Sequence, residues 1–152
     1  MPRAPFNVVV YPYIKVGENE FEYALLKRSD NGAWLGVAGG GEDTETLLEA
    51  ARRESYEEAG IRADSAFIKL DTIWPLPVTL FSPSHPWGKN MYIIPQYTFG
   101  VQVKDRRIVL SDEHTEYGWF KYKDAYDLLL YDIAKTALWE LDRKVRGLGP
   151  RD

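Results

Sequence analysis

The segment GGGEDTETLLEAARRESYEEAGI, from Gly39 to Ile61, constrains the fold of this chain more than any other stretch. Three consecutive glycines precede a run that predicts a helix from about Thr46 to Ala59, and Gly60 follows where the end of a helix favours glycine. Seven residues of the segment are carboxylates, and three of these crowd the end of the helix. Such a concentration of negative charge requires a physical reason.

Helical geometry separates the small residues of this segment from the acidic ones. At about 100° per residue, one face collects side chains that we expect to pack on a sheet: Leu48, Ala51, Ser55 and Ala59. Glu54, Glu57 and Glu58 share another arc and can point at one region of space. Their mutual repulsion costs roughly a few tenths of a kcal/mol per pair, and the helix dipole disfavours anions at this end.

Two interpretations of the three glutamates are open. One is a solvated helix face on which Arg52 and Arg53 compensate the charge. The other is a cage for hard divalent cations, which prefer carboxylate oxygens as ligands. The glycine run favours the second, because glycine lets the backbone come close to a metal or a phosphate, or adopt a positive φ.

Composition limits the classes of protein to which the chain can belong. Its 152 residues, 45% hydrophobic and 28% charged, predict one globular domain over residues 1–152, with a loose tail at about 147–152. The net charge of −4 argues against a sequence-independent nucleic-acid binder. The chain has no Cys and two His, which excludes disulfides, thiolate metal sites and a three-histidine site. A phosphate-bearing ligand therefore requires metal ions or a local cluster of Lys and Arg.

No apolar stretch of the sequence is long enough for a signal peptide or a membrane-spanning segment. We therefore expect a cytoplasmic protein without a membrane partner.

Hydrophobic patterns predict an α+β fold, in which a mixed β-sheet lies between helices. The expected strands are 6–15, 20–28, 66–78, 91–103 and 115–122, the first two being antiparallel. The third is expected to break at its prolines, and Pro95 places the fourth at an edge or a bulge. Residues 123–145 are expected to be helical with a break near Tyr131 and Asp132. The apolar face of this segment indicates either core packing or the surface of a homodimer.

The box of glycine, acidic and basic residues has a recognisable spacing. It consists of Gly39, Glu45, Arg53, Glu54, Ser55, Glu57, Glu58, Gly60 and Ile61. This spacing resembles the Nudix box of the MutT-like Nudix hydrolase superfamily, and a chance match at its seven fixed positions has a probability on the order of 10⁻⁸ per window. The resemblance implies the Nudix fold, an α/β/α sandwich with a mixed sheet.

The resemblance also implies roles for the box residues. Glu54, Glu57 and Glu58 correspond to ligands of Mg²⁺ or Mn²⁺, and the backbone carbonyl near Gly39 adds another. Arg53 corresponds to the residue that orients the glutamates by ion pairing, since it can reach Glu57 one turn on. In such a site the metal neutralises a pyrophosphate bridge and holds the leaving phosphate.

Glu45 is expected to have a structural role near the start of the helix, where acids are favoured.

Two features depart from the family pattern. Ser55 stands where the family prefers an aliphatic core residue, which predicts looser packing of the helix. Thr44 and Ala38 replace glycines that are often found around the loop.

Outside the box, Trp34 and the segment EHTEYGWFKYKDA resemble a Nudix subgroup that includes dihydroneopterin triphosphate pyrophosphatase and dATP pyrophosphohydrolase. In that subgroup the glutamate matching Glu113 lies on a loop over the metals, as a ligand or base. A solvated turn residue is the alternative. His114 beside it fits a residue that hydrogen-bonds within the loop.

Four residues are candidates for substrate contacts: Arg28, Trp34, Lys89 and Tyr92. Arg28 ends a strand and can bind a phosphate bidentately, with an exposed strand-end charge as the alternative. Trp34 and Tyr92 can stack on a flat base, although most tryptophans are core residues. Lys89 lies in the loop 81–90, which is expected to form part of a substrate lid.

The expected function is a Mg²⁺-dependent pyrophosphohydrolase that cleaves a nucleoside or pterin triphosphate to a monophosphate and pyrophosphate. The residues expected to carry catalysis are Glu54, Glu57, Arg53 and Glu113. Two alternatives are open: hydrolysis of a nucleoside diphosphate derivative such as ADP-ribose, and a non-hydrolytic nucleotide-binding Nudix domain.

Overall fold

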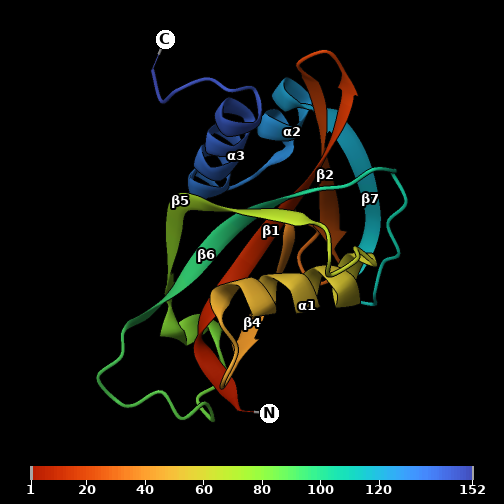
Figure 1. Ribbon diagram of the computed structural model, residues 1–152. Helices are drawn as coiled ribbons and strands as arrows, with labels where there is room; N and C mark the ends of the chain where they lie inside the picture. Colours follow the sequence, from red (N-terminus) through yellow and green to blue (C-terminus); the bar gives the residue numbers. More distant parts are fainter. Residues whose placement is uncertain (1, 152) are drawn as a thin grey trace.

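The computed structural model describes residues 2–151 and is built around a seven-stranded mixed sheet with helices on both faces (Figure 1). The strands are β1 (Arg3–Gly17), β2 (Glu20–Arg28), β3 (Trp34–Leu35), β4 (Val37–Glu42), β5 (Ala66–Pro77), β6 (Ile93–Gln102) and β7 (His114–Lys121). The helices are α1 (Leu47–Ala59), α2 (Tyr122–Leu128) and α3 (Asp132–Val145), and a short 3₁₀ turn, η1 (Val78–Leu80), follows β5. The α+β class and the predicted sandwich are confirmed.

Strand β1 is central to the sheet, because three other strands pair with it. The strand order is β3-β2-β1-β6-β5, with β4 also paired to β1 and β7 paired to β2. Strand β1 is antiparallel to β2 and β4 and parallel to β6, which makes the sheet mixed. Since β4 lies against the first half of β1, helix α1, which follows β4, begins directly on one face of the sheet.

The glycine run is part of a strand and not a flexible loop. In β4, Gly39 and Gly40 lie opposite Val8 and Asn7 of β1 in antiparallel register. The sequence did not predict this strand, because glycine has a low intrinsic preference for strands. The ready-made edge of β1 supplies hydrogen-bonding partners that override this preference.

Strand β5 continues through Pro75 to Pro77, so the predicted break at its prolines is wrong. Strand β5 is the last strand in the order and has an open edge, where a proline without an N–H group removes no ladder hydrogen bond. Pro95 of β6 lies opposite Pro75, one residue before β6 begins to pair with β1. The prediction that this strand lies at an edge is therefore wrong, since β6 lies between β1 and β5, and Pro95 is tolerated because only β5 pairs with this end of β6.

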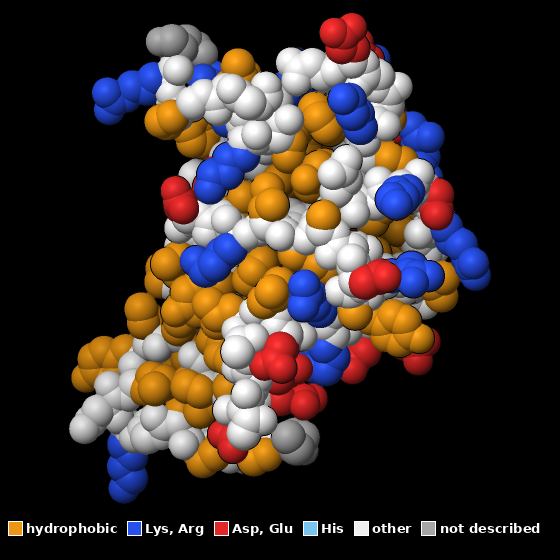
Figure 2. All heavy atoms as spheres, in the orientation of Figure 1, with side chains coloured by type: hydrophobic (Ala, Val, Ile, Leu, Met, Phe, Trp, Pro, Cys, Tyr) orange, Lys and Arg blue, Asp and Glu red, His pale blue; other side chains and the backbone are white. Residues whose placement is uncertain are grey.

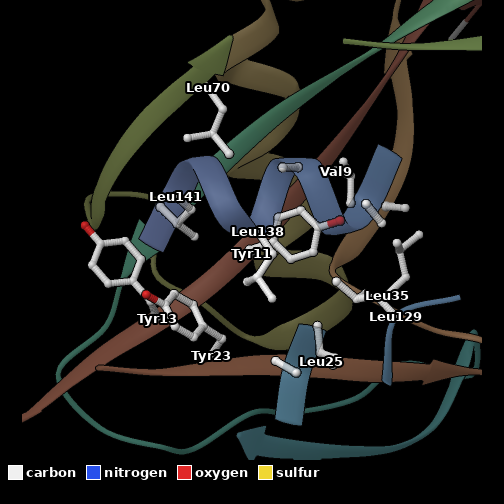
Figure 3. Close-up of a cluster of buried hydrophobic side chains, with 14 of the residues drawn as sticks. Val9, Tyr11, Tyr13, Tyr23, Leu25, Leu35, Leu70, Leu129, Leu138 and Leu141 are labelled. Carbon is white, nitrogen blue, oxygen red and sulfur yellow. The ribbon is translucent and has the colours of Figure 1, made fainter. Parts of the chain in front are cut away.

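The predicted break in the C-terminal helical segment is confirmed, since α2 ends at Leu128 and α3 begins at Asp132. Leu138 and Leu141 of α3 are fully buried against β1 residues such as Tyr11 (Figure 3). The structure therefore shows core packing for this face. Residues 147–151 follow α3 without regular structure, although the Gly149 carbonyl accepts a hydrogen bond from Arg143; residue 152 lies outside the described residues.

Helix α1 begins and ends with strong local signals. Thr46 accepts a hydrogen bond from the backbone N–H of Glu49, and the Glu49 side chain accepts one from the backbone of Thr46, which forms a capping box. Gly60 ends the helix with φ of 70°, a left-handed conformation that favours glycine. These caps explain why the predicted helix and the observed one coincide within one residue.

The buried face of α1 differs from the predicted one. Leu48 is 36% exposed, so its assignment to the packing face is wrong. Glu54 and Glu58 are instead buried, 8% and 7% exposed, beside Ala51 and Ser55. The helix is thus rotated so that two of its carboxylates lie between the helix and the sheet.

Ser55 is fully buried, and its hydroxyl has no hydrogen-bond partner among residues 2–151. Replacing Ser55 with alanine is expected to raise the free energy of unfolding by about 1 kcal/mol, because an unsatisfied buried hydroxyl is removed and alanine favours helix. Urea denaturation measures this change. The control is Ser29→Ala, which should lower stability because the Ser29 hydroxyl donates to the Asp112 carbonyl at 2.7 Å. A loss of stability in Ser55→Ala would contradict the assignment of an unpaired hydroxyl.

Hydrophobic side chains gather beside α1, over β5 and β6 and over the loop that connects them (Figure 2). Exposed apolar residues of this region include Ile73, Leu80, Tyr92 and Ile93. Among residues 2–151, no helix is long and apolar enough to cross a membrane.

Candidate active site

Three carboxylates converge at the end of α1. Glu54, Glu57 and Glu58 each offer an oxygen atom, and these oxygens lie within 4.8 Å of one another. Glu54 and Glu58 are buried, whereas Glu57 is exposed to solvent. The cluster therefore has a closed side against the sheet and an open side from which a ligand can approach.

Arg53 is the hub of this cluster. Its Nε donates to Glu45 at 2.7 Å, and one terminal nitrogen donates to Glu54 at 2.9 Å and to Glu57 at 3.3 Å. The other terminal nitrogen donates to the backbone carbonyl of Gly40 at 2.8 Å and to Glu45 at 2.9 Å. The planar guanidinium thus connects α1 to β4 and fixes the positions of the Glu54 and Glu57 carboxylates. The expected role of Arg53 requires this arrangement.

Glu45 lies before α1 and supports Arg53. Its carboxylate accepts two hydrogen bonds from Arg53 and one from the backbone N–H of Glu42. The hydrogen bonds from Arg53 hold the pKa of Glu45 below its usual value, despite partial burial. Glu45 is therefore ionised at neutral pH and keeps the guanidinium aligned.

The three glycines allow neighbouring side chains to lie close to the backbone, and they do not adopt unusual backbone angles. None of them has a positive φ. A Cβ atom at Gly39 would overlap the Glu54 carboxylate, one at Gly40 would overlap the Arg3 guanidinium, and one at Gly41 would overlap the Phe6 ring. The positive φ expected as one alternative is therefore wrong, the glycines make room for the side chains of Glu54, Arg3 and Phe6, and approach of the backbone to a metal or phosphate stays a prediction.

The loop before β7 reaches the cluster. The Ser111 hydroxyl donates a short hydrogen bond to Glu58, and the Glu113 backbone carbonyl accepts from the backbone N–H of Ser29 at 2.9 Å. Burial, followed by the charge of Glu58, raises the pKa of Glu113. The structure thus brings Glu113 next to Glu58 of the box, and its role as a ligand or base stays a prediction. Sequence reasoning missed Ser111, because a lone serine in a loop gives no signal.

His114, the first residue of β7, is buried directly after this loop. Neither of its ring nitrogens has a hydrogen-bond partner among residues 2–151, so its interpretation as a hydrogen-bonding loop residue is wrong. Its Nδ1 lies 3.7 Å from a Glu58 oxygen. Burial lowers the pKa of His114. The ring therefore packs behind Glu58 as a neutral side chain.

The four predicted substrate residues are not brought together. Arg28 lies near the cluster, where its charge acts on Glu113, but it forms a bidentate pair with Asp30 at 2.9 and 3.0 Å. Trp34 packs edge-to-face on Phe120, with ring centres 5.7 Å apart. Lys89 and Tyr92 lie exposed between β5 and β6, with Tyr92 81% exposed, and neither contacts the box.

Arg3 is a second residue that sequence reasoning missed. Its guanidinium lies against Gly40. The guanidinium carbon also lies 5.3 Å from the ring centre of Phe81 and 5.6 Å from that of Trp87. The indole N–H of Trp87 donates to the Arg3 carbonyl at 2.9 Å. The loop 81–90, which was expected to be a lid, is thus anchored on the first strand. Its role as part of a substrate lid stays a prediction.

A family comparison decides the classification of this arrangement. The family model described as NUDIX domain matches residues 7–141, which is most of the chain and includes the whole box. The chain belongs to the Nudix family.

Individual Nudix relatives agree with this classification. A Nudix hydrolase structure from Listeria monocytogenes is 38% identical, covers 95% of this chain and 96% of its own, and superposes with a TM-score of 0.83. The nucleoside triphosphatase NudI of Salmonella agona is 30% identical over 84% of this chain and 88% of its own. The E. coli dihydroneopterin triphosphate pyrophosphohydrolase shares the fold at a TM-score of 0.75 and 23% identity, over 94% of this chain and 98% of its own. The chain spans 62% of the length of a further relative, the mitochondrial Nudix hydrolase 13 of Arabidopsis thaliana.

Glu54 has the most unusual electrostatic environment of the Nudix cluster. Burial raises its pKa from 4.5 to about 7, although the hydrogen bond and charge of Arg53 act in the opposite direction. The folded protein therefore holds this proton up to about pH 7, whereas the unfolded chain releases it near pH 4.5. It follows that the free energy of unfolding falls as the pH rises between these values.

We expect the metal-free protein to be less stable at pH 8 than at pH 5, with Glu54 contributing on the order of 2 kcal/mol to the difference. Urea denaturation in a chelator at both pH values measures it. Glu54→Gln is the control, because glutamine has similar shape and does not titrate in this range. An identical pH dependence in the two proteins would contradict the assignment. A divalent cation should restore stability at pH 8, because it binds the ionised carboxylate.

Proposed function

We propose that the protein hydrolyses a nucleoside triphosphate to a monophosphate and pyrophosphate, with a divalent cation held by the Nudix cluster. The observation that carries this proposal is the convergence of Glu54, Glu57 and Glu58 within 4.8 Å. Three carboxylates repel one another at this distance, and Arg53, the cation hydrogen-bonded to the cluster, already has Glu45 as a partner. Such a site keeps an excess of negative charge that a cation balances.

The donor set fits Mg²⁺ or Mn²⁺. Both ions prefer oxygen ligands, and Mg²⁺ in particular combines carboxylates with the phosphates of a substrate. Glu54, Glu57 and Glu58 are the proposed ligands, with the Gly39 carbonyl as a further one; of the two roles open to Glu113, ligand or base, we propose the base. When bound, the cation supplies neutralisation of the pyrophosphate bridge and stabilisation of the leaving phosphate.

Residues of the chain supply orientation and proton transfer. Arg53 holds Glu54 and Glu57 in place through its fork of hydrogen bonds, so that they need not reorganise during the reaction. Glu113 is the proposed general base, since its raised pKa brings it closer to neutral pH. A water oxygen bonds to phosphorus, the bridging P–O bond breaks, and the water proton passes to the Glu113 carboxylate while pyrophosphate leaves.

A nucleoside triphosphate is the proposed substrate class. Support comes from the NudI relatives, which are nucleoside triphosphatases about 30% identical to this chain over most of both chains. Arg28 is the proposed phosphate contact among the four predicted residues, because it alone lies near the cluster; Trp34, Lys89 and Tyr92 stay predictions. A pterin triphosphate is an alternative substrate, but the dihydroneopterin enzyme shares only the fold with this chain.

The test is a turnover screen of purified protein with Mg²⁺ or Mn²⁺. The panel comprises nucleoside triphosphates, dihydroneopterin triphosphate and ADP-ribose, with the products separated by ion chromatography. We expect monophosphate and pyrophosphate from at least one nucleoside triphosphate. Cleavage of ADP-ribose alone would overturn the substrate class. Thermal stabilisation by nucleotides without any turnover would overturn the enzymatic proposal in favour of a nucleotide-binding domain.

A further inference from the structure

Four residues form a row across the sheet, one from each of four strands. Trp74 of β5 lies opposite Gln96 of β6, Gln96 lies beside Asn7 of β1, and Asn7 lies opposite Gly40 of β4. Residues in register on neighbouring strands face the same side of a sheet. This side is the one covered by α3, because Val9, two residues after Asn7, packs in the same cluster as Leu138.

The two ends of this row have different chemistry. At one end, the Trp74 ring lies 5.2 Å from that of Tyr131, and both rings are partly exposed. At the other end, Arg3 lies against Gly40, whose carbonyl accepts a hydrogen bond from Arg53 of the box. Three strand spacings separate the ends, about 14 Å. The row therefore extends from an aromatic pair to the residues of the box, and its length is about that of a nucleotide.

Hydrogen bonds along the row fix the orientation of its amides. An arginine side chain can only donate, and Arg3 donates to the Asn7 Oδ1 atom at 2.6 Å. The Asn7 amide nitrogen must then be the donor toward Gln96, whose Oε1 accepts at 3.2 Å. It follows that the Gln96 amide nitrogen points away from Asn7 as a free donor.

Gln96 is buried, with 4% of its surface exposed. Its amide nitrogen donates to no other group within residues 2–151. This nitrogen is not one of the fully buried side-chain atoms that lack a partner, so it keeps contact with solvent, from which a ligand can reach it. The side chain is held by Asn7 and Arg3 in an orientation that leaves this donor to a ligand.

We propose that the Gln96 amide nitrogen donates a hydrogen bond to a carbonyl oxygen on the edge of the substrate's flat ring, and so selects keto bases over amino bases. This inference rests on the proposed function. Guanine, hypoxanthine and uracil present a carbonyl where adenine and cytosine present an amino group. An amino group is itself a donor at this position and leaves Gln96 unpaired, which is the situation in which buried polar groups discriminate most strongly.

The test compares kcat/KM for GTP and ITP against ATP, and for UTP against CTP. ITP separates the effect of the carbonyl from that of the amino group at position 2 of guanine. The wild-type protein should prefer the keto member of each pair by at least about tenfold. Gln96→Met should lose most of this preference, and Gln96→Glu should shift it toward ATP and CTP, because a carboxylate accepts where the amide donates.

Asn7→Leu provides a second variant that keeps Gln96 but frees its amide to rotate, so the preference should also fall. Gln102→Met is the matched control, since Gln102 is an exposed glutamine of the same strand outside the row. Circular dichroism melting curves establish that each variant is folded. A keto preference that survives in Gln96→Met and Asn7→Leu, or no preference in the wild type, would overturn this inference and leave the hydrolase intact. Absence of hydrolysis of all five nucleotides would overturn the proposed function itself.

Discussion

Replacing Glu57 by glutamine is expected to lower kcat by about a thousandfold while the fold is retained. Glu57 is the exposed member of the carboxylate cluster, so its loss leaves the packing of α1 unchanged. The amide keeps the size of the side chain but removes the negative charge that a divalent cation requires. Steady-state hydrolysis at saturating Mg²⁺ measures kcat, and calorimetry with Mn²⁺ measures the accompanying loss of affinity.

The matched control for this variant is Glu49→Gln on the same helix. Glu49 is also exposed, and glutamine can replace glutamate in a capping box. We expect this control to retain wild-type kcat and stability. Near-normal activity in Glu57→Gln would contradict the assignment of Glu57 as a metal ligand, whichever nucleotide is used.

Replacing Arg53 by methionine should affect both stability and catalysis. Glu45 and Glu54 would each lose their ion-pair partner in a largely buried setting, which is expected to lower the free energy of unfolding by about 2 kcal/mol. The loss of carboxylate orientation should lower kcat by about a hundredfold. Arg53→Lys should restore part of the stability but little of the activity, because an ammonium group cannot make the five hydrogen bonds of the guanidinium fork.

The neighbouring Arg52 offers the control. It is exposed and points toward the ring of Phe67 at 5.9 Å, away from the carboxylates. Arg52→Met should change stability and kcat only slightly. If the Arg52 and Arg53 variants behaved alike, Arg53 would be a charge-compensating surface residue and the hub would have no functional meaning.

Local signals explain why α1 and the break between α2 and α3 could be predicted from the sequence. Capping residues, a terminal glycine and helical periodicity all act within a few residues of the position that they determine. The convergence of Glu54, Glu57 and Glu58 follows from the same local geometry. Their proposed role does not, and it depends on the resemblance of the box to a known family.

Features that depend on contacts between distant residues could not be predicted. Strand β4 exists because β1 offers an edge, and the burial of Glu54 is possible because Gly39 leaves room for its carboxylate. Ser111 reaches Glu58 across 53 residues of sequence, and Asn7 reaches Gln96 across 89. Trp34 shows that closeness in the sequence can also mislead. Its position next to the glycines suggested a substrate contact, whereas its ring packs on Phe120.

The parallel pairing of β1 with β6 also has a consequence for the order of folding. Asn7 to Tyr13 find their partners in Gln96 to Gln102, so this half of the sheet closes a long loop before it gains any stabilising contact. During synthesis, β1, β2 and β4 can associate well before β6 emerges, and α1 can dock on them. The acidic cluster is therefore assembled early, whereas the row from Trp74 to Gly40 waits for the second half of the chain. The proposed metal ligands of α1 can thus be in place before β6 and the proposed base, Glu113, have been synthesised.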